Sequence, residues 1–310
     1  MPPSRRRVLV LGAAALAAGC APTPASAPAP PAVTNDPFAP IEAGFVGRLG
    51  VFALDTATGR TVGHRADERF LMCSTSKMPT AAAILAARVP LDEVVRYSAG
   101  DLVRNSPTTS RATAMTIRDL CAAAITVSDN TAENLLLRRL GGPKAVEAYV
   151  RSIGDGVSSF DRTEPDLNVR TGTLDTSTPR QMAATLQACT LGAGLDDTGR
   201  RQLTAWLVAN TTGGPRIRAG LPPGWRTGDK TGSGDGGEVN DVAITWPPAG
   251  DAAQRSSTPQ AGDAAQRSST PQDRGPLLVA VYTEPADPTS QRNVPAVPAA
   301  AAAAIRALGF

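Results

Sequence analysis

Apolar and polar residues alternate along residues 48–70. This stretch, "RLGVFALDTATGRTVGHRADERF", holds two alternating runs separated by the turn sequence "TATGR", which is the pattern of a β-hairpin. Three more strand patterns come late in the chain: "WRTGDKTGSG", "EVNDVAITWPP" and "PLLVAVYTEP". The alternation therefore predicts strands near both ends of the chain.

Between these strands, the apolar positions follow the helical period. Helices are predicted over residues 75–88, 116–127, 130–142, 142–154, 178–192 and 196–214, and a last one over 297–308. Gly141 and Gly142 supply a stop signal after one of them. Strands at both ends with helices between them indicate a mixed sheet assembled from both termini, with an all-helical lobe of about residues 75–210 inserted. A cleft between the lobes is the expected place for a site.

The composition is that of an ordinary globular protein, and it narrows the chemistry. The 310 residues are 42% hydrophobic and 19% charged, with a formal net charge of +3, enough chain for one large domain or two small ones. No basic stripe with interleaved aromatic residues is present, so we expect no nucleic-acid partner. The single histidine, His64, excludes a zinc site built from several histidines. A Ser-His-Asp triad would have to use His64, which we instead expect to be a surface or half-buried strand residue.

The first 37 residues predict a processing signal and a tether. Three arginines at 5–7 precede the apolar run 8–19, which is too short to span a membrane as a stable helix. Paired arginines there match a Tat signal, which directs the export of folded proteins. Cys20 follows small residues, as at a bacterial lipoprotein cleavage site; ordinary cleavage further along is the alternative. Residues 1–20 are therefore interpreted as the signal, and the Pro/Ala-rich residues 21–37 as the tether.

Export also decides how the other cysteines are interpreted. Cys73, Cys121 and Cys189 show no C-x-x-C spacing, so they indicate neither a metal knot nor a thioredoxin-like site. A chain that folds in the cytoplasm before export need not use a disulfide framework, and we expect three buried, small hydrophobic residues. The protein is expected in the periplasm or cell envelope, with a lipid on Cys20 as its only contact with a membrane, or secreted.

A tandem duplication lies between two of the late strand patterns. The sequence "AGDAAQRSSTPQ" at 249–260 recurs letter for letter at 261–272. Its composition cannot bury enough apolar area to offset the entropy of ordering, so we expect a flexible, extended loop over 249–272. The alternative is that the longer loop loosens the neighbouring strands and alters the range of substrates.

Two of the three lysines in the chain lie in short polar motifs. Ser74 and Lys77 are three positions apart at a predicted helix start, so the amine can reach the hydroxyl. A serine N–H near the positive end of the helix dipole suits the stabilisation of an oxyanion. A buried lysine can act as a proton acceptor, whereas an arginine cannot. Taken alone, the Ser-x-x-Lys match is weak.

Three further motifs follow it in order. They are Ser128, Asp129 and Asn130 in "SDN"; Glu164 and Asn168 in "EPDLN"; and Lys230, Thr231, Gly232 and Ser233 in "KTGS". Taken separately, the first is equally typical of a helix N-cap and the last of a turn. Four such motifs in one order indicate a single active site.

The set of motifs resembles that of the class A serine β-lactamases. The likeness runs from about residue 38 to the C-terminus, apart from the duplication, so residues 38–310 would form the catalytic domain. It implies a two-lobe α/β (α+β) fold of the serine β-lactamase and penicillin-binding-protein type, with a mixed, mostly antiparallel five-stranded sheet flanked by helices and an all-helical lobe. It is specific, since Glu164 and Asn168 distinguish these β-lactamases from their penicillin-binding relatives.

Carried over residue by residue, the resemblance implies a catalytic role for five side chains. Ser74 resembles the nucleophile that opens the β-lactam carbonyl to an acyl-enzyme. Lys77, or Glu164 through a water, is the candidate base for that step. Ser128 resembles the proton relay to the ring nitrogen. Glu164 and Asn168 would hold the water that hydrolyses the ester.

The resemblance also implies how substrate is bound. Backbone N–H groups of Ser74 and Ser233 would form the oxyanion hole, and Asn130 would bind the acylamide arm. The substrate carboxylate is assigned to the KTGS segment: Lys230, Thr231, Gly232 and Ser233. Many members place an arginine at the position of Val239. Some members instead carry a compensating arginine at the position of Arg216, so we predict that Arg216 supplies this charge; a plain surface arginine is the alternative.

Some positions depart from the family pattern. Asn105 stands where the family commonly has an aromatic wall of the site. The loop after it, and the segment 168–175 of the Ω-loop, are each about two residues shorter than usual. Arg162 and Asp175 resemble the ion pair that clamps the neck of the Ω-loop.

Two cysteines resemble halves of disulfides whose partners are missing. Cys121 matches one half of a disulfide found in some relatives, but Ala81 stands in its partner's place. Cys73 has a partner only in enzymes with a cysteine at the position of Gly234. Both are therefore expected to be free thiols.

The leading hypothesis is hydrolysis of the β-lactam amide bond of antibiotics through a serine acyl-enzyme, which gives β-lactam resistance. One alternative is a penicillin-binding DD-peptidase or esterase relative, which would acylate and stall; Glu164 argues against it. The other is a non-catalytic lipoprotein that binds peptidoglycan, which gives no reason for two lysines and a glutamate at these places. The expected partner is a small-molecule β-lactam, bound by a monomer without cofactor or metal.

Overall fold

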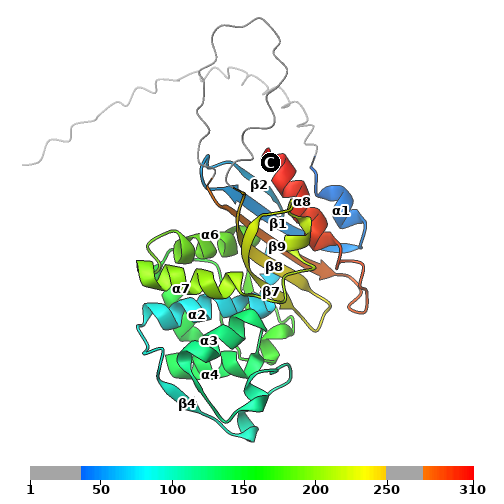
Figure 1. Cartoon of the computed structure of the whole chain (residues 1–310). Coiled ribbons are helices and arrows are strands. Elements are labelled where there is room, and N and C mark those ends of the chain that lie inside the picture. Colours follow the sequence, from blue (N-terminus) through cyan, green and yellow to red (C-terminus); the bar gives the residue numbers. More distant parts are fainter. Residues whose placement is uncertain (1–35, 249–274) are drawn as a thin grey trace, which may run out of the picture. The chain divides into compact units, whose positions relative to one another are not determined.

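The protein is described by a computed structural model over residues 36–248 and 275–310. A five-stranded sheet lies at the centre of one of its two lobes (Figure 1). In spatial order the strands are β2 (Thr61–His64), β1 (Gly47–Asp55), β9 (Leu277–Pro285), β8 (Val239–Trp246) and β7 (Arg226–Ser233). Strands from both ends of the described chain therefore share one sheet, as the alternation predicts.

The sheet with its flanking helices confirms the predicted fold class. Each pairing between these five strands is antiparallel, so the sheet has no parallel pair of the kind that a mixed sheet contains. The reason is the connectivity. Strands β7, β8 and β9 follow one another along the chain and alternate in direction, and β1 lies against β9 in the opposite direction.

Strand β9 is buried on both faces. Leu277, Val279 and Val281 belong to the core that the sheet shares with helix α8 (Ala296–Ala307). The alternate residues Leu278, Ala280 and Tyr282 belong to the core that the sheet shares with the helical lobe. A strand covered on both faces is apolar throughout, which is why "LLVAVY" is a continuous apolar run.

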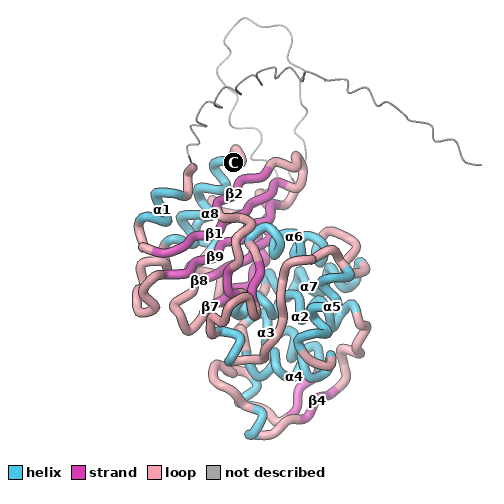
Figure 2. Tube along the Cα trace, turned by 180° about the vertical axis from the view of Figure 1, so that it is seen from behind, coloured by secondary structure: helices cyan, strands magenta, loops and turns pink. Residues whose placement is uncertain are grey.

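The second lobe is helical and lies beside the β7 edge of the sheet (Figure 2). Its helices are α2 (Lys77–Ala86), α3 (Ile117–Thr126), α4 (Asn130–Leu140), α5 (Pro143–Ser152), α6 (Pro179–Thr190) and α7 (Asp197–Val208). Each lies within its predicted range and is a few residues shorter. Helix α4 ends at Gly141, whose φ of +98° is the left-handed conformation that the glycine stop signal predicts.

Several short elements have no counterpart in the sequence prediction. They are helix α1 (Ala39–Ala43), the pair β3 (Phe70–Leu71) with β6 (Thr176–Ser177), and the pair β4 (Val94–Arg96) with β5 (Ala114–Thr116). Elements of two to five residues are too short to show a period. The β3–β6 pair matters for the site, because it joins the end of the Ω-loop to the segment that leads to Ser74.

His64 lies half-buried on β2, the edge strand farthest from β7. Its Nδ1 lies 2.6 Å from Asp36 Oδ2, and its Nε2 forms a hydrogen bond with Glu42. This position confirms the prediction that His64 is a half-buried strand residue. It also places the imidazole at the sheet edge opposite to β7, and therefore far from Ser74.

Three predictions fall on residues outside the described ranges. They are the signal with Cys20, most of the 21–37 tether, and the duplication at 249–272, and they stay predictions. Among the described residues, no helix combines the length and the apolar character needed to cross a bilayer.

Candidate active site

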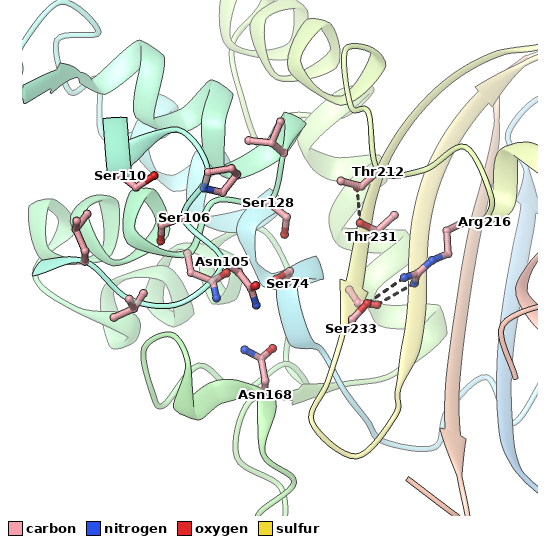
Figure 3. A pocket seen from close by; sticks show the side chains of 16 residues that line it. Ser74, Asn105, Ser106, Ser110, Ser128, Asn168, Thr212, Arg216, Thr231 and Ser233 are labelled. Carbon is pink, nitrogen blue, oxygen red and sulfur yellow. Dashed lines mark hydrogen bonds between the residues drawn. The ribbon is translucent and has the colours of Figure 1, made fainter. Parts of the chain in front are cut away.

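Ser74 lies in a 3₁₀ turn, Cys73–Ser76, that leads directly into α2. Cys73 has a φ of +48°, a left-handed conformation that costs free energy in a non-glycine residue and that clusters at functional sites. Ser74 lines a cleft of about 680 Å³. In Figure 3 it lies between Ser128 above and Asn168 below, with the β7 residues Thr231 and Ser233 to the right.

Lys77 is the first residue of α2 and is fully buried. Its Nζ lies 2.6 Å from Ser74 Oγ, 2.7 Å from Asn130 Oδ1 and 2.5 Å from Glu164 Oε1. A buried ammonium is costly unless it is paired and hydrogen-bonded, and here three oxygens surround it. These contacts hold the amine against the serine hydroxyl and account for a lysine in a chain that otherwise favours arginine.

Glu164 brings a carboxylate to the same serine from the Ω-loop. Its Oε1 lies 3.3 Å from Ser74 Oγ, and its Oε2 accepts a hydrogen bond from Asn168 Nδ2. Asn134 of α4 fixes the backbone of Glu164: Asn134 Oδ1 accepts from the Glu164 N–H at 2.9 Å, and Asn134 Nδ2 donates to the Glu164 carbonyl at 2.8 Å. The carboxylate is thus positioned from the helical lobe as well as from its own loop.

The neck of the Ω-loop is closed by the predicted ion pair. Arg162 Nε lies 2.6 Å from Asp175 Oδ2, which confirms that prediction. The Arg162 guanidinium also donates to the Val169 carbonyl at 2.7 Å inside the loop. On the other side, the Asp235 N–H donates to the Asn168 carbonyl at 3.0 Å, which attaches the loop to the turn between β7 and β8.

The SDN motif combines a helix cap with a cleft wall. Asp129 is the N-cap of α4, and its Oδ1 accepts from the Ala132 N–H at 2.9 Å, as the N-cap interpretation predicts. Its neighbours Ser128 and Asn130 line the cleft. Across the cleft, Lys230 Nζ donates to Ser128 Oγ at 3.0 Å. The cap therefore holds two polar side chains toward Lys77 and Lys230.

Arg216 lies beside β7 at the cleft (Figure 3). Its Nη2 donates to Ser233 Oγ at 2.9 Å, and its Nη1 donates to the Gly232 and Asn240 carbonyls at 3.0 and 2.9 Å. Val239, the alternative place for an arginine, is a buried apolar residue of β8. The positive charge at this end of β7 therefore comes from Arg216.

The loop that carries Asn105 forms the opposite rim of the cleft. Asn105 has a φ of +59°, and its carbonyl accepts from the Asn130 N–H at 3.0 Å. Its neighbour Arg104 reaches across to the turn between β7 and β8, where its Nη2 lies 2.7 Å from Asp235 Oδ1. Asn105 and the Arg104–Asp235 ion pair therefore form this rim of the cleft, and position 105 has no aromatic side chain.

Comparison with known proteins agrees with this geometry. Residues 35–254, more than half of the chain, match the model of the beta-lactamase enzyme family. A beta-lactamase of Amycolatopsis lactamdurans is 44% identical over 295 residues, which cover 93% of this chain and 89% of that protein. The solved class A beta-lactamase from Mycobacterium abscessus is 47% identical, with a TM-score of 0.80, and the match covers 89% of this chain and 99% of that chain. This chain belongs to the class A beta-lactamases.

Another similar protein is beta-lactamase AST-1 of Nocardia asteroides, which is 50% identical over 262 residues. The match covers 79% of this chain and 84% of that protein.

In the described part of the present chain, the cysteines Cys73, Cys121 and Cys189 are buried and free, as predicted. A Cβ added to Gly234 would lie 2.9 Å from Cys73 Sγ. The two positions are therefore neighbours, and the second sulfur of a disulfide is missing.

The sequence prediction missed three polar residues of this beta-lactamase site. Asn134 brackets Glu164, Thr212 Oγ1 lies 2.6 Å from Thr231 Oγ1, and Asn240 Nδ2 donates to the Leu71 carbonyl at 2.9 Å beside Cys73. A signal existed only for Asn134, which lies four positions after Asn130 and so on the same face of α4.

In residues 36–248 and 275–310, no three His, Cys, Asp or Glu side chains gather as a metal site.

Proposed function

We propose that this chain hydrolyses the amide bond of β-lactam antibiotics through an acyl-enzyme on Ser74, and so gives β-lactam resistance. The observation that carries the proposal is the convergence at one hydroxyl: Lys77 Nζ lies 2.6 Å and Glu164 Oε1 3.3 Å from Ser74 Oγ. A serine hydroxyl is a weak nucleophile until a neighbouring base takes its proton. Both candidate bases are within reach of that proton.

Acylation begins when Ser74 Oγ attacks the lactam carbonyl and its proton passes to Lys77 or to Glu164. The carbonyl oxygen gains negative charge, which the N–H groups of Ser74 and Ser233 stabilise as the oxyanion hole. The ring C–N bond then breaks, and Ser128 Oγ delivers a proton to the departing nitrogen. Lys230 Nζ, 3.0 Å from Ser128 Oγ, orients that hydroxyl and stabilises its charge during the transfer.

Deacylation uses the other side of the site. The side chains of Glu164 and Asn168 hold a water, Glu164 takes one of its protons, and the resulting hydroxide attacks the ester carbonyl. The proton returns to Ser74 Oγ as the ester bond breaks. Asn168 Nδ2 contacts Glu164 Oε2 and the Pro165 carbonyl, and these contacts fix the amide next to the carboxylate.

The deciding experiment is incubation of the purified protein with benzylpenicillin, followed by measurement of hydrolysis and of the intact mass. Steady turnover with no lasting mass increase supports the proposal. A persistent adduct of the mass of the penicillin without turnover would instead identify a DD-peptidase relative. Absence of both would favour the peptidoglycan-binding lipoprotein.

Arg216 is proposed to bind the substrate carboxylate together with Lys230, Thr231 and Ser233. Replacing Arg216 with alanine is expected to raise KM for penicillins and cephalosporins about tenfold, equivalent to about 1.4 kcal/mol of binding. The change acts mainly on KM, because the carboxylate is bound in the ground state as in the transition state. The Arg216→Lys variant keeps the charge and serves as the matched control. An unchanged KM in Arg216→Ala would contradict this role.

The pH dependence of kcat/KM tests the role of Lys230. Burial lowers the pKa of the Lys230 ammonium to about 7, and the charge of Lys77 acts in the same direction. Lys230 is therefore charged below this pH and neutral above it, and kcat/KM is expected to fall as the pH rises through about 7. An arginine stays charged throughout this range, so the Lys230→Arg profile is expected to lose the fall. A Lys230→Arg profile that falls as the wild type does would refute the assignment.

We further propose that the protein is exported by Tat and acts as a monomer in the periplasm or cell envelope, with Cys20 as a lipid attachment site. The paired arginines and the small residues before Cys20 support this. Fractionation of cells that express the Arg5/Arg6→Lys variant tests the export route, since retention in the cytoplasm is the expected result.

A further inference from the structure

The two hydroxyl groups of β7 that line the cleft, those of Thr231 and Ser233, have different hydrogen-bond partners (Figure 3). Ser233 Oγ accepts a hydrogen bond from Arg216 Nη2 at 2.9 Å. Thr231 Oγ1 lies 2.6 Å from the hydroxyl oxygen of Thr212, a residue of the segment that follows α7. A hydroxyl carries one proton and two lone pairs, so these partners decide which of the two hydroxyls can donate to a ligand in the cleft.

The orientation of the Asn210 amide is fixed by the groups around it. The Thr212 backbone N–H, which can only donate, lies 3.0 Å from Asn210 Oδ1. At the other end of the amide, Asn210 Nδ2 donates to Asp229 Oδ2 at 2.7 Å, and Asp229 Oδ1 accepts from Arg218 Nε at 2.6 Å. Asn210 and Asp229 are both buried. The amide oxygen of Asn210 therefore points to Thr212, and it can only accept.

This orientation sets the direction of the hydrogen bond between Thr212 and Thr231. Thr212 Oγ1 lies within hydrogen-bond distance of two oxygens, Asn210 Oδ1 at 2.8 Å and Thr231 Oγ1 at 2.6 Å. Because the amide oxygen has no proton, Thr212 must donate its own proton to Asn210. Thr212 then has no proton for Thr231, so Thr231 donates to Thr212. The proton of Thr231 is thus held by Thr212, and only lone pairs of Thr231 Oγ1 remain for a ligand.

Ser233 has the opposite polarity. A guanidinium group only donates hydrogen bonds, so the contact with Arg216 occupies a lone pair of Ser233 Oγ and leaves the Ser233 proton available to a ligand. A carboxylate only accepts hydrogen bonds. A substrate carboxylate at this end of β7 therefore meets a donor at Ser233 and lone pairs at Thr231.

We propose that Thr212 is a positioning residue that weakens the binding of the substrate carboxylate by holding the proton of Thr231, and that Ser233 is the main hydroxyl donor to this carboxylate. The inference rests on the proposed function, which assigns the carboxylate to this end of β7. For Thr231 to donate to the carboxylate, its proton must turn away from Thr212. Thr212 then either turns its own proton from Asn210 to Thr231, or faces the Thr231 oxygen with no proton between them. One hydrogen bond of the chain is lost in both cases, which offsets part of the gain in binding.

Replacing Thr212 with alanine is expected to improve substrate binding. KM for benzylpenicillin is expected to fall about fivefold, which is the effect of no longer losing one neutral hydrogen bond on binding. The value of kcat is expected to stay at that of the wild type, because the carboxylate is bound alike in the ground state and the transition state. Asn210 Oδ1 keeps the backbone N–H of position 212 as its donor in this variant. Alanine is preferred to valine, whose methyl group would replace an oxygen only 2.6 Å from Thr231 Oγ1.

Two control variants separate the hydroxyl of Thr212 from its packing. Thr212→Ser keeps the hydroxyl and is expected to keep the wild-type KM. Thr211→Ala changes the neighbouring, exposed threonine, whose hydroxyl donates to the Thr126 carbonyl at 2.8 Å, and is also expected to keep the wild-type KM. A merely structural role of Thr212 predicts a raised KM or a lowered kcat in Thr212→Ala. Either result would overturn the inference, and so would an unchanged KM or an equal fall of KM in Thr212→Ser.

The unequal shares of the two β7 hydroxyls are measured without changing Thr212. Ser233→Ala is expected to raise KM about tenfold, and Thr231→Ala only about twofold, since the bond from Thr231 to the carboxylate is partly offset. Equal losses in these two variants would overturn the inference. This comparison decides the matter should the melting temperature show that Thr212→Ala does not fold.

Where Thr212→Ala folds, the double variant completes the test. In the Thr212→Ala background, the change Thr231→Ala is expected to raise KM about tenfold, because the full hydrogen bond to the carboxylate is then lost. An effect of Thr231→Ala that is the same in both backgrounds would overturn the inference.

The wild-type protein separates this inference from the proposed function. A wild-type protein that neither hydrolyses benzylpenicillin nor is acylated by it would overturn the proposed function, and the inference with it. A wild-type enzyme that turns over penicillin, with the same KM as Thr212→Ala, would overturn the inference alone.

Discussion

Replacing Ser74 with alanine is expected to lower kcat/KM for penicillins by at least about 10⁴-fold. Lys77 and Glu164 both contact the Ser74 hydroxyl, and without it no covalent intermediate forms. Removal of the nucleophile from a comparable serine enzyme costs about 10⁶ in kcat. The measurement is the steady-state rate of penicillin hydrolysis, together with the intact mass after incubation.

The matched control is Ser152→Ala, which removes an exposed hydroxyl from the last turn of α5. This hydroxyl donates a hydrogen bond to the Tyr149 carbonyl, at 2.6 Å, within its own helix. This variant is expected to keep wild-type kcat/KM. Ser74→Ala is expected to remain folded, because Ser74 is a small residue in a turn, and an equal melting temperature verifies this. A Ser74→Ala protein that still hydrolyses penicillin would disprove the covalent mechanism.

The Glu164→Gln variant is expected to convert the enzyme into one that acylates and then stalls. Glutamine keeps the shape of the side chain but cannot take a proton from water, so the loss falls on deacylation. General base catalysis contributes about 10²- to 10⁴-fold, and kcat is expected to fall by a factor near the upper end of that range. The acyl-enzyme then accumulates and is detected as a mass increase equal to one penicillin.

Glu93→Gln is the control for this substitution. Glu93 is partly exposed and pairs with Arg139 at the far end of α4, with Glu93 Oε1 2.7 Å from Arg139 Nε. Its loss is expected to leave turnover unchanged. A Glu164→Gln protein that deacylates as fast as the wild type would assign the hydrolytic step to another group.

Much of the fold follows from the period of apolar residues. The hairpin of β1 and β2 and the helices α2 to α7 appear where alternation and the helical period predict them, because each buries one face or one stripe in a core. Strand β9 was also predicted as a strand, and the structure explains its continuous apolar run, since both of its faces are covered. The short helix α1 and the two small sheets were not, because two to five residues carry no measurable period.

The residues of the site can also be divided into those that the sequence predicts and those that it does not. Ser74, Lys77, Glu164 and Lys230 were identified because their motifs, in this order, resemble those of the class A β-lactamases, and because lysine is rare in this chain. The residues that hold them in place were not identified. Asn134, for example, acts through the backbone of Glu164. Such contacts depend on how α4 and the Ω-loop pack, and the sequence indicates only that Asn134 shares a helix face with Asn130.

The pairing of β1 with β9 has a consequence for how the chain acquires its structure. Val51 pairs with Val281, so the middle of the sheet joins segments that a ribosome produces far apart in time. Loop closure over such a separation is slow, and it must precede the contacts that reward it. Until β9 arrives, the neighbouring edges of β1 and β8 remain open to other chains. The proposed export by Tat, which carries folded proteins, would protect these edges by completing the sheet before transport.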